Sequence, residues 1–169
     1  LGIPVYSMHT NLDIADDGLN DHLAKKLELK DVEKLDQDKF EDPFMRVGFL
    51  NEEMSLKDFT GYVKDKLKLE NVILVSNDDN KKVQKVALCS GAGKSFMKDA
   101  LKVKADCFVT GDMNYHGALD ALDEGINIID AGHYGTERIV TSLLYEFLSQ
   151  IEEVEVVESQ TMINPLKIY

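Results

Sequence analysis

The sequence contains no tryptophan, only two cysteines and three prolines in 169 residues, and no long apolar run. Cys89 and Cys107 stand apart inside apolar segments, which favours two buried thiols and a reducing compartment over a disulfide framework. An Asn-x-Ser/Thr glycosylation acceptor is missing. No apolar stretch approaches the roughly 20 residues that a transmembrane helix needs. We therefore expect a cytoplasmic protein without a membrane anchor.

Positive charge is also scarce, because 19 Lys and Arg residues face 31 Asp and Glu residues and give a formal net charge of −12. Such a field repels phosphates, which argues against nonspecific binding to nucleic acids or anionic membranes. A chain of this length suffices for one globular domain or two small ones. It opens on Leu1 rather than Met, and its first apolar residues are too few for a signal peptide, so we expect a truncated chain.

Short β-rich segments alternate with helical patterns, which is typical of an α/β protein. The predicted strands cover residues 3–8, 46–50, 72–76, 83–89, 106–110, 126–130 and 154–157. Apolar spacings of three and four residues predict helices over 56–69, 96–101, 115–124 and 136–151, and one around Leu19, Leu23 and Leu27. Ser55 and Gly125 are predicted caps. The charged segment 30–43 is predicted to be a connection.

Three of the four histidines lie in loops that follow predicted strands. The loops are His9-Thr10-Asn11-Leu12-Asp13, Gly111-Asp112-Met113-Asn114-Tyr115-His116 and Asp130 to Glu137. In open α/β sheets, ligands bind at the carboxyl ends of the strands, where such loops meet. These loops are therefore the predicted functional site.

His133 and Glu137 are four residues apart at a predicted helix start, so both side chains would lie on one helix face. An imidazole beside a carboxylate suits a divalent metal, but a site needs three or more ligands, so Asp13 or His9 would have to join. Alternatively, Glu137 only stabilises the helix N-terminus and His133 only binds a loop. The spacing leaves both interpretations open.

Asp112 and His116 also admit two interpretations: helix capping, which the spacing favours for Asp112, or support of a site and proton transfer. His22 lies on the apolar face of a predicted helix and is excluded from the site. The Gly91-Ala92-Gly93-Lys94-Ser95 turn invites comparison with a phosphate loop. However, Leu88 stands where that motif needs glycine, so we do not expect a nucleotide triphosphatase.

Four motifs together resemble one known family. They are His9-Thr10-Asn11-Leu12-Asp13, Thr110-Gly111-Asp112 with Tyr115-His116, Gly132-His133-Tyr134-Gly135-Thr136-Glu137, and Asn164-Pro165-Leu166-Lys167. The chain resembles the Nif-three-like family, whose members are commonly labelled GTP cyclohydrolase 1 type 2 homologs. The resemblance implies a layered α/β fold with a mixed sheet and a metal cleft between two lobes. Residues 1–40 and 130–169 would be the remnant of the first lobe, and residues 45–128 would form the second.

The resemblance further implies a dinuclear centre of divalent metal ions, which could be zinc, iron, manganese or nickel. The residues that match its ligand motifs are Asp13, His133 and Glu137. Those that match neighbouring motifs are His116 and His9, as catalytic groups, and Asp112 and Tyr115, as supporting or substrate-binding groups. The family's remaining ligands, an adjacent His-His pair, have no counterpart in this sequence. We expect two ions per subunit in an intact chain, and fewer or none in this one.

The function that the resemblance implies is a metal-dependent hydrolase of unknown small-molecule substrate, assembled as a homohexameric ring. The alternative is a non-catalytic, ring-forming metal-binding adaptor or metal chaperone. Replacing His116 with alanine would separate the two, because only an enzyme has turnover to lose.

Overall fold

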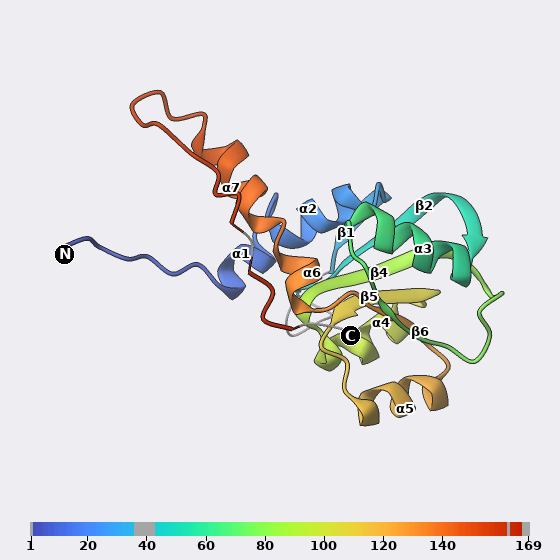
Figure 1. Cartoon of the computed structure of the whole chain (residues 1–169). Coiled ribbons are helices and arrows are strands. Elements are labelled where there is room, and N and C mark those ends of the chain that lie inside the picture. The colour runs from blue at the N-terminus through green and yellow to red at the C-terminus, as the bar shows by residue number, and fades with distance from the viewer. Residues whose placement is uncertain (1, 36–42, 162, 167–169) are drawn as a thin grey trace.

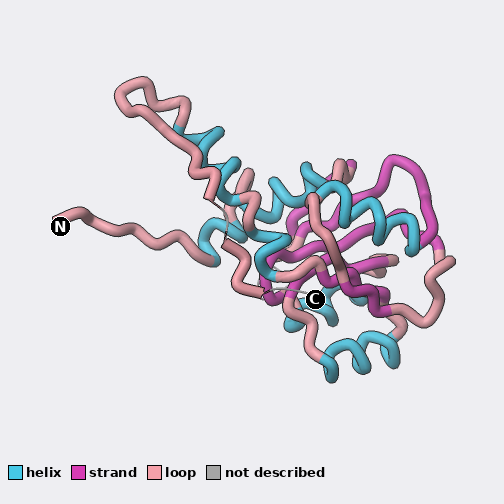
Figure 2. Tube along the Cα trace, in the orientation of Figure 1, coloured by secondary structure: helices cyan, strands magenta, loops and turns pink. Residues whose placement is uncertain are grey.

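The computed structural model describes residues 2–35, 43–161 and 163–166, in which six strands form one mixed sheet in the order β1-β2-β4-β5-β6-β3 (Figures 1 and 2). The strands are β1 Lys30–Lys34, β2 Arg46–Ser55, β3 Ile73–Val75, β4 Lys82–Ala92, β5 Cys107–Gly111 and β6 Asn127–Asp130. Strands β4, β5 and β6 run parallel to one another. The other neighbouring pairs are antiparallel. The predicted mixed sheet is confirmed.

Helices cover both faces of this sheet (Figure 1). They are α1 Thr10–Ile14, α2 Leu19–Lys26, α3 Leu56–Lys66, the 3-10 turn η1 Lys94–Phe96, α4 Met97–Lys102, α5 Tyr115–Glu124, α6 His133–Glu137 and α7 Val140–Leu148. Side chains alternate along β4, so that Leu88 packs with α2 and α3 while Ala87 packs with α4 and α5. Every residue of β5 and β6 is buried, as two-sided burial requires.

The local capping signals decide where several helices begin and end. Ser55 caps α3 by accepting a hydrogen bond from the Asp58 backbone N–H at 3.1 Å, as predicted. Gly125 ends α5 with φ of 77°, also as predicted. Asn114 caps α5, because its Oδ1 accepts from the Gly117 N–H at 2.8 Å. The capping role considered for Asp112 is therefore wrong, and its side chain is free for another contact.

Several predicted elements differ from the structure. The strands predicted over 3–8 and 154–157 are wrong: both segments are largely exposed and pair with no described strand, and β structure needs a partner. The predicted connection 30–43 contains β1, which pairs with β2, while residues 36–42 lie outside the described part. The helix predicted over 136–151 is two helices, α6 and α7, separated by the turn residues Arg138 and Ile139.

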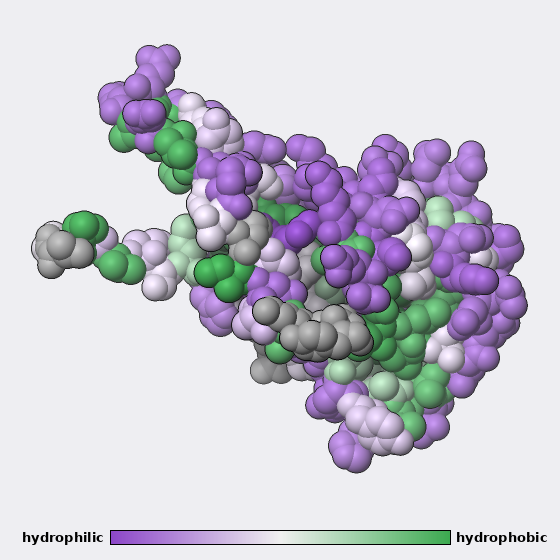
Figure 3. Space-filling model, viewed as in Figure 1, coloured by the Kyte–Doolittle hydropathy of each residue, from purple (hydrophilic) through white to green (hydrophobic). Residues whose placement is uncertain are grey.

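Two segments project from the sheet and its helices: the arm of residues 2–9 and α7 with the loop that follows it (Figure 1). Both carry apolar side chains at the surface (Figure 3), including Val5 at 89% and Phe147 at 66% exposure. No helix in the described ranges is both long and apolar enough to span a bilayer. The projections are thus surface features with apolar side chains that the described chain leaves uncovered.

Candidate functional site

Three segments meet at the carboxyl ends of the parallel strands. Gly91 lies near the end of β4, Asp112 directly follows β5, and His133 is the first residue of α6, which follows β6. This edge is where loops and ligands converge in open α/β sheets. The structure therefore brings together two of the loops that the sequence singled out, 111–116 and 130–137, and adds the end of β4 to them.

His133 lies between two carboxylates, one on each side of its ring. Its Nδ1 is 2.7 Å from Asp112 Oδ2, and its Nε2 is 3.1 Å from Glu137 Oε1. The hydrogen bond with Asp112 raises the pKa of His133, against a smaller opposing effect of burial. Burial raises the pKa of Glu137, against the attraction of His133. The predicted face shared by His133 and Glu137 is confirmed, and Asp112 completes a row of three side chains.

The backbone of Gly91 lies directly against His133 and Glu137 of this row. Its φ is 61°, in the left-handed region, and a Cβ at this position would overlap Glu137 Oε1 and lie 3.3 Å from His133 Nε2. The Gly91 N–H donates to Thr136 Oγ1 at 2.9 Å, and that hydroxyl is also within 3.0 Å of the carbonyl oxygen of Gly132. A side chain at position 91 would displace the carboxylate, so glycine is required here.

Asp13 approaches from α1 and is held by groups on α2 and β4. Ser90 Oγ donates to Asp13 Oδ1 at 3.3 Å. Asn20, fully buried, accepts from the Ser90 N–H at 2.8 Å and donates to the Asp13 carbonyl at 3.2 Å. Burial raises the pKa of Asp13, while its hydrogen bond with Ser90 and the nearby charges of His9 and His133 lower it. Asp13 therefore belongs to the same electrostatic cluster as His133.

Arg46 supports the segment that carries Asp13. Its side chain is 1% exposed, and its Nη2 donates to the Ala15 carbonyl at 2.8 Å and to Asp21 Oδ2 at 2.9 Å. One buried guanidinium thus ties the turn after α1 to α2. Because Nε also donates to Asp21 Oδ1 and Nη1 donates to the carbonyls of 43–45, the guanidinium holds the turn after α1 in place.

The other candidate residues lie less close to the row. His9 precedes α1 and is exposed, and its charge acts on both Asp13 and Glu137. Tyr115 and His116 are exposed on the first turn of α5 and contact each other, with ring centroids 5.7 Å apart. Among the described residues, neither of these two hydrogen-bonds to His133. Their predicted roles stay predictions.

The donor types suit a divalent cation, but the described side chains do not close around one. His133 Nε2 and Glu137 Oε1 are 3.1 Å apart, and two ligands of one metal ion lie about 3 Å apart. Within the part of the chain that the structure describes, no group of three or more His, Cys, Asp and Glu side chains is arranged to hold a metal ion. His133 and Glu137 are thus a pair of suitable metal donors, and Asp13 lies in the same electrostatic cluster.

Sequence reasoning missed the residues that position this cluster, which are Asn20, Arg46, Ser90 and Thr136. Asn20 gave a usable signal, because it is a polar residue beside Leu19 on the apolar face of a helix. Gly91 was noticed only as part of a failed phosphate-loop comparison. Thr136 and Ser90 gave none, since only the fold reveals that they meet residues 45 and 77 positions away.

Fold and site together define a class: a layered α/β protein with an imidazole and carboxylates gathered at the carboxyl ends of its parallel strands. Within that class, the chain belongs to the family described as DUF34/NIF3 (NGG1p interacting factor 3), whose profile matches residues 1–165. This family is the one that the four sequence motifs indicated, so the resemblance is confirmed.

The chain is similar to several known sequences and solved structures. It is 36% identical to a GTP cyclohydrolase 1 type 2 homolog of Lactococcus lactis over 97% of this chain and 63% of that protein. It matches a solved structure of Staphylococcus aureus hypothetical protein SA1388 with a TM-score of 0.84 and 27% identity, covering 96% of this chain and 67% of that one. Reduced HcgD from Methanocaldococcus jannaschii matches with a TM-score of 0.71 and 35% identity, over 89% and 58% of the two chains. The chain thus spans about two thirds of these relatives.

Proposed function

We propose that this chain is a divalent-metal-binding protein with Asp13, His133 and Glu137 as ligands, and that it contributes to a metal-dependent hydrolase acting on a small molecule. The observation that carries the proposal is the His133 and Glu137 pair, packed against a glycine that has no room for a side chain. A simple surface ion pair would not need the backbone to approach so closely.

The charges of the cluster support the metal proposal. Burial raises the pKa of both Asp13 and Glu137, so their ionised forms are disfavoured in the metal-free chain. A bound divalent cation would offset that cost. The contact with Asp112 also supports the metal proposal. When His133 carries its proton on Nδ1 and donates it to Asp112, the lone pair of Nε2 is free to bind a metal.

A divalent ion at this place would lower the pKa of a bound water and polarise a substrate oxygen. Asp112 would orient His133, and Gly91 would leave room for the Glu137 carboxylate. His116 or His9 would transfer protons. The name of the relatives, GTP cyclohydrolase 1 type 2 homolog, supports a hydrolase and leaves this chain's substrate open.

The alternative, a ring-forming metal-binding adaptor or metal chaperone, is favoured by a different observation. The arm of residues 2–9 and α7 expose apolar side chains that a ring contact or a partner would cover. Light scattering measures whether the chain forms a hexamer. Turnover that is present in the wild type and lost in His116→Ala favours the enzyme. Metal binding without any turnover favours the adaptor.

The metal proposal is tested by elemental mass spectrometry after dialysis against zinc, iron, manganese or nickel. We expect bound metal in the wild type, and a clear loss in Asp13→Asn and Glu137→Gln. Asp120→Asn removes a carboxylate from an exposed position on α5 and serves as the matched control. No metal in the wild type, or unchanged metal in both site variants, would overturn the ligand assignment.

A further inference from the structure

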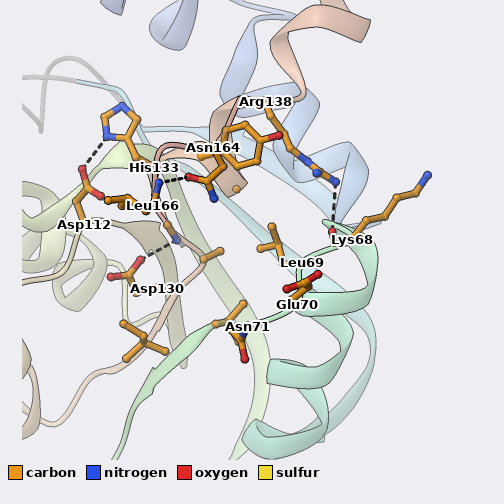
Figure 4. Close-up of a pocket in the computed structure, with 16 residues that line it drawn as sticks. Lys68, Leu69, Glu70, Asn71, Asp112, Asp130, His133, Arg138, Asn164 and Leu166 are labelled. Atoms are coloured by element: carbon orange, nitrogen blue, oxygen red, sulfur yellow. Dashed lines mark hydrogen bonds and ion pairs between the residues drawn. The ribbon is translucent and has the colours of Figure 1, made fainter. Parts of the chain in front are cut away.

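A pocket of about 720 Å³ opens beside His133, at the carboxyl end of β6 (Figure 4). Its walls come from residues 68–73 between α3 and β3, from residues 130–135 after β6, and from Arg138, Asn164 and Leu166. Its volume lies in the range of about 300–1,000 Å³ that is usual for small-molecule sites. We propose that this pocket binds a ligand made of a heteroaromatic ring and an anionic group, and that it presents this ligand to His133, a role that rests on the proposed function.

Apolar side chains from separate segments line the pocket and suit the faces of a flat ring. They are Leu69, Val72, Ile73, Ala131, Tyr134 and Leu166. Ile73 is 61% exposed on the edge strand β3, so its side chain is available to contact a ligand in the pocket. The wall is tightly built, because a Cβ at Gly135 would lie 2.9 Å from Leu69 Cδ1. A planar ring can bury its faces against such a surface without displacing the side chains that form it.

Two amide side chains line the same pocket and suit the edge of a heteroaromatic ring. Asn71 offers both a hydrogen-bond donor and an acceptor, and Asn164 offers its amide donor, since its Oδ1 already accepts from the Leu166 N–H at 3.1 Å. Asp130 is already occupied, since its two oxygens accept the backbone N–H groups of Met113 and Gly132, each at 2.8 Å. The amides therefore provide polar recognition without adding an unpaired charge, which favours a ring with alternating donors and acceptors.

Positive charge gathers at the side of the pocket away from His133. In Figure 4, Lys68 and Arg138 lie opposite His133 and Asp112. Arg138 Nη2 donates to the Leu67 carbonyl at 2.8 Å, and the guanidinium lies 5.8 Å from the centre of the Tyr134 ring. A guanidinium has five N–H donors, so an anion can still bind to it. Two cations in one pocket wall stand out in a chain of net charge −12, even with Glu70 between them.

The orientation of the ligand follows from these two ends. The anionic group would meet Arg138 and Lys68, the ring would lie along Tyr134 and the aliphatic wall, and the far edge of the ring would face His133. The part of the ligand nearest the candidate metal ligands would then be its ring rather than its anion. This arrangement assigns the pocket a substrate class that combines a ring and a negative charge.

The test is ligand titration of the ¹⁵N-labelled chain by NMR in the presence of EDTA. Guanosine 5′-monophosphate supplies the ring and the anion, guanosine lacks the anion, and ribose 5-phosphate lacks the ring. We expect the monophosphate to shift the Asn71 and Asn164 side-chain amides and the backbone signals of Gly132 and Tyr134. Guanosine should bind several-fold more weakly, and ribose 5-phosphate should leave Tyr134 unshifted. Two results would overturn the proposal. One is equal shifts from ribose 5-phosphate. The other is no shift in these residues with any of the 5′-monophosphates of guanosine, adenosine and uridine at millimolar concentration.

Variants check that the shifts report this pocket. Tyr134→Leu should weaken the monophosphate roughly tenfold by removing a stacking surface, whereas Tyr145→Leu on α7 should leave its affinity unchanged. Asn71→Leu should weaken it as well, and Asn51→Leu on β2 is the matched control. If both pocket variants bind as the wild type does, the pocket assignment is wrong.

A second titration with Mn²⁺ separates this proposal from the metal proposal. Paramagnetic broadening around Glu137 and Asp13 reports metal binding without any nucleotide. Broadening without nucleotide shifts would overturn the pocket proposal alone. Nucleotide shifts without broadening would overturn the metal proposal alone and leave the ligand pocket standing.

Discussion

His133 shows how one side chain can depend on several loops at once. Its ring lies between Asp112, which follows β5, and Glu137, which lies one helical turn farther along α6. Asp112 reaches it from a left-handed backbone conformation, with φ of 55°. Aspartate adopts that conformation more readily than most residues other than glycine. The backbone at Asp112 thus directs the carboxylate to His133 rather than to the start of α5.

The pH dependence of stability should reveal this contact in the metal-free chain. The pKa of His133 is raised, chiefly by Asp112, so the folded state holds the imidazole proton more tightly than the unfolded chain. The resulting stabilisation is complete below the unfolded pKa of about 6.5 and is lost as pH rises through the raised folded value. Urea unfolding of wild type and Asp112→Asn, from about pH 5.5 to 8.5, should show a difference that shrinks toward high pH. A difference that stays constant would contradict the assignment, and Asp120→Asn controls for lost charge.

Gly91 makes a second prediction at the scale of one residue. Gly91→Ala should destabilise the chain by about 1–3 kcal/mol, because alanine must adopt a left-handed φ and its Cβ overlaps Glu137. Gly61→Ala is the matched control: nothing lies within 4 Å of that position inside α3, so the change should stabilise by about 0.5–1 kcal/mol. Urea unfolding measures both. A Gly91→Ala variant as stable as the wild type would mean that the cluster is loosely packed.

At the scale of elements, the start of α5 shows how short-range chemistry chooses between neighbouring candidates. Asp112 and Asn114 both precede the helix, and both residue types cap helices well. Asn114 is the cap because it adopts extended backbone, with φ of −84° and ψ of 165°, whereas Asp112 is left-handed. Asn114 therefore caps α5, while Asp112 contacts His133.

The capping role is measurable. Asn114→Ala should cost about 1 kcal/mol of unfolding free energy, because the Gly117 N–H loses its acceptor. Ser55→Ala at the start of α3 removes an equivalent contact and should cost a similar amount. Equilibrium unfolding in urea compares the two. If Asn114→Ala were neutral while Ser55→Ala was not, α5 would not depend on its cap.

The helix predicted over 136–151 was correct in its apolar period and wrong in its continuity. The stripe is present, but α6 ends at Glu137 and α7 begins at Val140, and none of the residues of α7 is buried. An apolar period predicts a helical face that some surface will cover, and it does not say which surface. The strands predicted over 3–8 and 154–157 failed for a related reason, since an extended apolar segment needs a neighbouring strand.

For the whole molecule, burial is most complete in the central strands β5 and β6. Phe108 on β5 is fully buried, whereas Phe147 on α7 is 66% exposed. Phe108→Ala should cost roughly 3–5 kcal/mol, while Phe147→Ala should change stability by less than about 0.5 kcal/mol in the isolated chain. Urea unfolding of both variants tests this. A large loss for Phe147→Ala would show that α7 is covered in solution, and light scattering would then show whether a second copy covers it.

Much of the architecture could be predicted from local patterns. The five central and edge strands from Arg46 onward, the helices around Leu56 and Tyr115, and the caps at Ser55 and Gly125 all follow from short-range chemistry. The row of Asp112, His133 and Glu137 could be predicted only in part. The spacing of His133 and Glu137 placed them on one face, but Asp112 joined them through the fold. The division into two lobes and the metal cleft stay predictions.

The sequence by itself determined the α/β class, most helix and strand positions, the family, and the loops where chemistry gathers, because apolar periods, caps and motifs are properties of neighbouring residues. Tertiary structure alone decided that Thr136 holds Gly91, that Asn20 and Ser90 hold Asp13, and that a pocket joins the loop after α3 to the end of β6. These contacts join residues tens of positions apart, and their distances follow from strand order and packing, which no local pattern contains.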